Sequence, residues 1–119
     1  MTQQTHYYSA TSRDFLAKAH AYLNEGDLLQ ASEKGWGAAA EMVKSVAEAR
    51  GWPHNTHRDM WRAVNRLAHE AGDRAMLAHF HIAESLHINF YEGWLPQEAV
   101  EHGISQVEEL LQQLYPLAE

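Results

Sequence analysis

The stretch "ASEKGWGAAAEMVKSVAEA", residues 31–49, decides the fold class. Its small and apolar residues recur at helical spacing on two adjoining faces. Only a narrow stripe is polar, and it runs through Glu33, Glu41, Lys44 and Glu48. A helix that is apolar over most of its circumference belongs in the middle of a bundle or at an oligomer interface. Gly35 and Gly37 each cost about 1 kcal/mol of helix propensity relative to alanine, so we expect them to allow close packing against a neighbouring helix.

The sequence on either side of this stretch predicts four more helices and no strand. Thr11 with Asp14, and Thr56 with Asp59, form capping-box patterns, and Pro96 suits the first position of a helix. We expect helices over residues 11–24, 27–50, 56–71, 73–93 and 96–114. Because the loops are short, neighbouring helices should run antiparallel. The predicted fold is an all-α, antiparallel, five-helix up-and-down bundle.

The composition limits the classes of function that the chain can serve. The length suits one domain, residues 1–119, with residues 1–10 as an N-terminal extension. The chain has no cysteine, no signal-peptide pattern and no run near the ~18 to 20 apolar residues of a membrane span, so we expect a cytoplasmic protein. A net charge of -7 argues against nucleic-acid binding. Arg58, Arg62 and Arg66 share one helix face, which we interpret as a solvated stripe paired with acids.

Two segments together suggest a family. "ASEKGWGAAAEMVKSVA" and "HIAESLHINFYEGWL" resemble the PaREP family, and the similarity covers residues 16–114. These small helical proteins are related to the HEPN superfamily (higher eukaryotes and prokaryotes nucleotide-binding) and to the C-terminal domain of kanamycin nucleotidyltransferase. The resemblance implies an antiparallel helical bundle that often dimerises through its helices. It also implies a nucleotidyltransferase-type protein as a partner.

Other HEPN domains cleave RNA with an arginine and a histidine that have four to six residues between them. The corresponding family segment aligns best with "LHINFY", residues 86–91, and places His87 where the arginine would stand. A histidine is mostly neutral at pH 7, so it would not reliably stabilise developing negative charge as a guanidinium does. Arg74 and His79 have four residues between them and lie near the right place. They are the candidate catalytic pair if the chain is a ribonuclease.

Glu84, His87 and Tyr91 lie together along one edge of the core face of the predicted fourth helix. As a ligand site, Glu84 would orient the imidazole and Tyr91 would bind the ligand. As structural residues, His87 and Tyr91 would bury their rings and hydrogen-bond to a neighbouring helix or subunit, which is the interpretation we favour. Glu84 and His87 have the Glu-x-x-His spacing of di-iron bundles, but no second such motif exists, so we expect no metal and no other cofactor.

The function predicted from the sequence is a non-enzymatic, HEPN-like helical module. It would form a homodimer, because the second helix has more apolar surface than four short neighbours in one subunit can cover. Its candidate ligands are a nucleotide or a partner protein. The alternative is a metal-independent ribonuclease that acts as a dimer, with Arg74 and His79, or His87 and Tyr91, paired across the interface.

Overall fold

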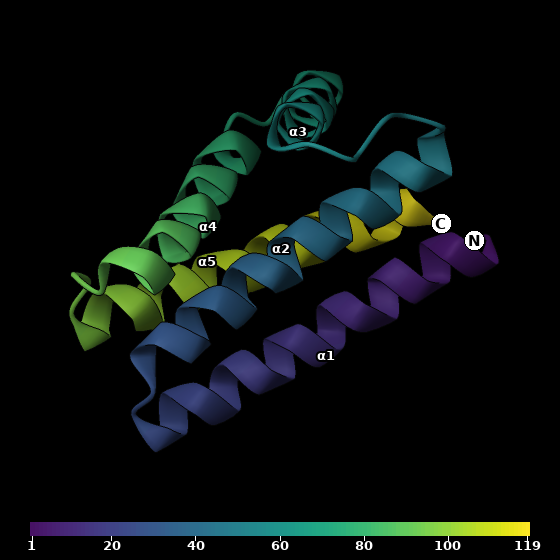
Figure 1. The fold of residues 1–119 in the computed structure, drawn as a ribbon. Helices are drawn as coiled ribbons and strands as arrows, with labels where there is room; N and C mark the ends of the chain where they lie inside the picture. Colours follow the sequence, from purple (N-terminus) through teal and green to yellow (C-terminus); the bar gives the residue numbers. More distant parts are fainter.

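The structure, a computed structural model, describes residues 1–119 as five α-helices followed by one short 3-10 turn (Figure 1). The helices are α1 (Gln3–Glu25), α2 (Leu28–Arg50), α3 (His57–Ala71), α4 (Ala75–Glu92) and α5 (Gln97–Leu114), and the turn is η1 (Tyr115–Ala118). There is no strand. The expected all-α, antiparallel five-helix bundle is therefore confirmed. Both chain termini lie at one end of the bundle (Figure 1).

The helix that contains "GWGAAA", α2, is the centre of the bundle. It packs against α1, α4 and α5, and it also contacts α3 (Figure 1). Its small and apolar residues are buried within the single chain, among them Gly35, Ala38, Ala39, Val43 and Val46. The expectation that α2 needs a second subunit to cover it is therefore wrong, because four helices of the same chain are enough. A homodimer has to be argued from another surface.

Leu86 of α4 explains why α2 and α5 each have a glycine where they contact α4. Its side chain is fully buried between Gly35 of α2 and Gly103 of α5. A Cβ atom on Gly103 would lie 2.7 Å from Leu86 Cδ2, and a Cβ atom on Gly35 would lie 3.0 Å from Leu86 Cδ1. The close packing expected of Gly35 is thus confirmed, and α4 fits between α2 and α5 by means of this one leucine.

The first helix begins at Gln3, eight residues before the expected start at Thr11. Thr2 caps it, since its side chain accepts a hydrogen bond from the backbone N–H of Thr5. Residues 3–10, expected to precede the helix, are its first two turns. The face that these turns bury is made of small polar residues, so it does not look like an apolar stripe.

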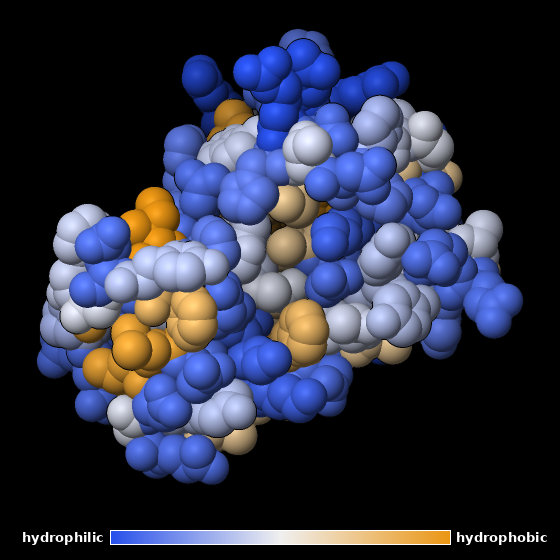
Figure 2. Space-filling model, in the orientation of Figure 1, coloured by the Kyte–Doolittle hydropathy of each residue, from blue (hydrophilic) through white to orange (hydrophobic).

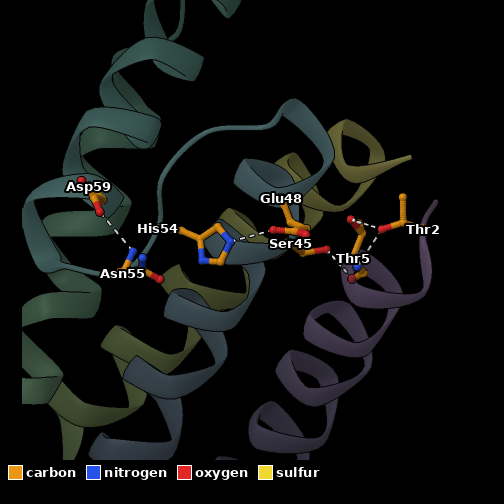
Figure 3. A network of polar contacts seen from close by, with 7 residues as sticks. All are labelled: Thr2, Thr5, Ser45, Glu48, His54, Asn55 and Asp59. Atoms are coloured by element: carbon orange, nitrogen blue, oxygen red, sulfur yellow. Dashed lines mark hydrogen bonds and ion pairs between the residues drawn. The ribbon is translucent and has the colours of Figure 1, made fainter.

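Two buried serines, one from each helix, form hydrogen bonds between α1 and α2. Ser12 Oγ donates to the carbonyl oxygen of Ala38 at 2.6 Å. Ser45 Oγ donates to the carbonyl oxygen of Thr5 at 2.8 Å (Figure 3). A buried hydroxyl that donates to a helix carbonyl is paired without loss of the helix's own hydrogen bonds. The serines therefore allow α1 to pack closely on α2 along its whole length.

The connection from α2 to α3, residues 51–56, is held in one conformation by polar contacts. His54 Nε2 lies 2.8 Å from Glu48 Oε2, and Asp59 Oδ2 accepts the backbone N–H of Asn55 at 3.1 Å (Figure 3). The expected Thr56 cap is present, since Thr56 Oγ1 accepts the N–H of Asp59. Figure 1 shows α3 nearly end-on, so this helix crosses its neighbours instead of running alongside them.

No helix combines the length and the apolar character that crossing a membrane requires.

Candidate functional site

Histidines, tryptophans and carboxylates from three helices meet on one side of the bundle. We call this group the His57–His87 cluster. Its members are Glu33 and Trp36 of α2, His57 and Trp61 of α3, and Glu84 and His87 of α4. The cluster contains two of the three residues that the sequence singled out on α4.

His87 is held on two sides by α2. Its Nδ1 atom lies 2.8 Å from Glu33 Oε1, and its ring stacks on Trp36 with centroids 5.2 Å apart and planes at 30°. The side chains of His87 and Glu33 are 25% and 27% exposed, so the pair lies at the edge of the core. Stacking fixes the plane of the imidazole, and the carboxylate fixes its rotation. His87 therefore joins α4 to α2.

Glu84 is directed at α3 and not at His87. Its Oε2 atom accepts the indole N–H of Trp61 at 2.9 Å and lies 3.9 Å from His57 Nδ1. Tyr91 is 71% exposed, and its ring meets that of His87 edge-on with centroids 5.4 Å apart. The structure thus brings His87 and Tyr91 together, but it directs Glu84 away from the imidazole that it would orient in a ligand site.

No cavity opens beside the His57–His87 cluster. The chain has four cavities, and none of them is lined by His57, Glu84 or His87. No three histidine, aspartate or glutamate side chains are arranged to hold a metal ion. A proton-transfer site needs room for a substrate within hydrogen-bond reach of its acid and base. The contacts of the cluster instead connect α2, α3 and α4.

Arg74 and His79 do not converge on one site. At 100° per residue, five positions along α4 place them about 140° apart around the helix. His79 is 8% exposed, and its Nδ1 atom lies 2.7 Å from Gln106 Oε1 of α5. Arg74, at the N-cap of α4, instead lines a cavity beside α3 that His79 does not reach.

Comparison with known proteins gives the family. The model of the archaeal PaREP1/PaREP8 family matches residues 7–111. The chain belongs to this family. Among solved structures, a crystal structure of a protein from Sulfolobus solfataricus matches with a TM-score of 0.81 and 21% sequence identity. The match covers 92% of this chain and 97% of the other. It shows that the two proteins share a fold. No curated protein sequence matches this chain significantly.

The arginine stripe of this PaREP1/PaREP8 protein is only partly paired with acids. Arg66 Nε lies 3.9 Å from Glu70 Oε1, and the Arg66 guanidinium lies over the Trp52 ring at 4.4 Å. Arg58 and Arg62 form no ion pair within 4.0 Å. The expectation of a fully paired stripe is therefore wrong for two of its three members.

Sequence reasoning missed the α2 and α3 members of the His57–His87 cluster. Glu33 was placed on the solvent stripe of α2, and Trp36 was interpreted as a core residue. One signal was present, since Glu33 and Trp36 are three residues apart and so share a helix face. His57 follows the capping residue Thr56, and nothing in the local sequence shows that the first turn of α3 packs against α4.

Proposed function

We propose that this PaREP1/PaREP8 protein is a non-enzymatic, HEPN-like helical module in which residues 1–119 act as one unit and form a homodimer. The observation that supports the proposal is a gathering of exposed apolar side chains at one end of the bundle. We call it the end patch, and its members are Leu29, Ile88, Tyr91 and Trp94. The chain has only six large exposed hydrophobic side chains, and four of them lie here, which argues against random scatter.

The end patch extends from the start of α2 to the end of α4. Leu29 Cδ2 would lie 3.7 Å from a Cβ atom on Gly93, so Leu29 is next to the connection that contains Trp94. Strongly hydrophobic atoms gather at this end of the molecule, at the lower left of Figure 2, where Figure 1 places the same two elements. Ile88 and Tyr91 are three residues apart on α4, so they lie on neighbouring positions of its surface near the end of that helix.

The end patch has both parts of a self-complementary interface. A shallow groove of about 480 Å³ runs between α2 and α4 and is lined in part by Leu28, Leu29 and Leu95. Trp94 beside it is 66% exposed. In a two-fold dimer each copy offers the same surface, so the Trp94 of one copy can enter the groove of the other. Tryptophan and tyrosine in a partner's pocket supply much of the binding energy of protein interfaces.

The surroundings of the candidate catalytic residues support the module over the ribonuclease. Arg74 and His79 face different parts of the molecule, and the His57–His87 cluster has no cavity beside it. The net charge of -7 also repels RNA. The same charge makes two copies repel each other, so we expect salt to strengthen the dimer by screening.

The molar mass in solution tests the proposal. Sedimentation equilibrium over a range of concentrations should give twice the chain mass of 13.6 kDa for the wild type. Trp94→Ser should give the mass of one chain. Tyr7→Ser is the matched control, because Tyr7 is an exposed aromatic residue of α1, 61% exposed, outside the end patch. A monomeric wild type, or a Trp94→Ser variant that dimerises as well as the wild type, would refute the end-patch dimer.

A further inference from the structure

A small cavity opens between the α2–α3 connection and α3, on a part of the chain that the proposed dimer does not use. It has a volume of about 180 Å³ and is lined by Trp52, Pro53, Asp59, Arg62, Ala63 and Arg66. We call it the Trp52 cavity. Apolar groups and guanidinium groups share its wall.

The apolar part of the Trp52 cavity is suited to a flat hydrocarbon group. Trp52 and Pro53 come from the connection, and the buried Ala63 comes from α3. An apolar cavity of about 150 Å³ can hold a benzene molecule. The Trp52 cavity therefore has room for one aromatic ring, while larger ligands are normally bound in pockets above about 300 Å³.

The charged part of the Trp52 cavity is suited to an anion. Arg62 and Arg66 are one helical turn apart, so their guanidinium groups extend from the same face of α3. Arg62 has no ion-pair partner in the chain, and Arg66 shares Glu70 with Arg50. Asp59, the one acid in the lining, already accepts the backbone N–H of Asn55. Arg62 is thus a free cation beside an apolar wall, in a protein whose net charge is -7.

Contacts within the protein fix the shape of the Trp52 cavity. The backbone N–H of Trp52 donates to the carbonyl oxygen of Ala47 at 2.8 Å, which fixes the chain where α2 ends. The indole of Trp52 is covered by the guanidinium of Arg66 at 4.4 Å and approached by that of Arg50 at 5.4 Å. Cation–π contacts of this kind hold the ring in place.

We infer that the Trp52 cavity binds a small organic anion that has one aromatic ring. The ring lies against Trp52, Pro53 and Ala63, and its carboxylate or phosphate group binds Arg62 and Arg66. Guanidinium groups form paired hydrogen bonds with both kinds of oxyanion, so the recognition chemistry is the same.

The test uses benzoate and phenyl phosphate as probes, with benzyl alcohol and inorganic phosphate as controls. Binding is followed by NMR through the indole N–H signal of Trp52, which Trp52→Phe identifies. At least one of the two aromatic anions should shift that signal to saturation, and comparison of the two distinguishes a carboxylate ligand from a phosphate ligand. Benzyl alcohol and inorganic phosphate, each of which has only one of the two features, should bind at least about tenfold more weakly.

Two arginine variants separate a specific site from general charge. Arg62→Gln should raise the Kd of the bound aromatic anion about tenfold, as expected when a charged hydrogen-bonding partner is lost. Arg58→Gln removes the same charge one turn away on the same stripe, outside the cavity, and should leave the Kd within about twofold. The inference is overturned if neither aromatic anion shifts the Trp52 signal. It is also overturned if either control binds as tightly, or if Arg58→Gln weakens binding as much as Arg62→Gln.

Discussion

His87 of α4 and Glu33 of α2, 54 residues apart in the sequence, lie 2.8 Å from each other. The same imidazole stacks on Trp36. The resemblance to HEPN domains would place an arginine at the position of His87. In this structure the histidine has a structural role. It connects two helices at the edge of the core.

Replacing Glu33 tests that task. Glu33→Ala leaves His87 Nδ1 without its partner, and we expect the free energy of unfolding to fall by about 0.5–1.5 kcal/mol. Urea unfolding should show a lower midpoint with an unchanged slope. Glu92→Ala is the control, since Glu92 is exposed on α4 and has no partner. Equal midpoints for the two variants would show that the His87–Glu33 contact contributes nothing.

Gly103→Ala tests the packing of Leu86. The new methyl group would lie 2.7 Å from Leu86 Cδ2, and Leu86 cannot retreat because Gly35 bounds it on the other side. Overpacking costs about 1–3 kcal/mol, and alanine returns about 1 kcal/mol of helix propensity, so we expect a net loss of about 1 kcal/mol.

A double-mutant cycle shows whether Leu86 is the cause of that loss. In a Leu86→Ala background, Gly103→Ala should be neutral or stabilising, because the clash is gone. The same loss in both backgrounds would place the strain elsewhere.

Asn89→Ala should destabilise the protein by more than the small volume that it removes would suggest. Asn89 is buried, its Nδ2–H donates to Ser32 Oγ at 3.0 Å, and its Oδ1 accepts the backbone N–H of Leu95 at 2.8 Å. The substitution leaves the Leu95 N–H unpaired, whereas Ser32 Oγ still donates to the carbonyl oxygen of Leu28, so we expect a cost of about 2 kcal/mol. Thermal unfolding should show a Tm lower by roughly 10 °C. Asn65→Ala, an exposed asparagine of α3, should change the Tm by less than about 2 °C.

The purified protein should not cleave RNA in the presence of a metal chelator. His79 is buried against Gln106, and Arg74 lies on a different side of α4. A gel assay on a mixed RNA substrate with wild type and His79→Ala should therefore show no cleavage by either. Cleavage by the wild type that His79→Ala abolishes would establish the ribonuclease and refute the non-enzymatic proposal.

The helices were largely predictable because their signals are local. Thr56 caps α3 by accepting the N–H of Asp59, as the sequence indicated, and Asp27 caps α2 by accepting the N–H of Gln30. The start of α1 was missed because the face it buries consists of Thr5, Ser9 and Ser12. A search for apolar periodicity cannot find a buried face that is made of small polar residues.

The candidate site was less predictable because its contacts are long-range. The spacing of Glu84 and His87 on one helix predicted that they act together, yet each is bonded to a different helix. Which neighbour a side chain meets depends on the rotation of α4 against α2 and α3. That rotation is set by packing such as the insertion of Leu86 between two glycines, which a single sequence does not reveal.

The two termini lie at one end of the bundle and the end patch lies at the other (Figure 1). The 23 residues of α2 separate the two ends, roughly 35 Å at 1.5 Å per residue. A reporter domain or an affinity handle fused at either terminus would therefore stand clear of Trp94. A circular permutant that opens the chain at the Gly26 turn would, in contrast, have its new termini beside Leu29. There they would obstruct self-association.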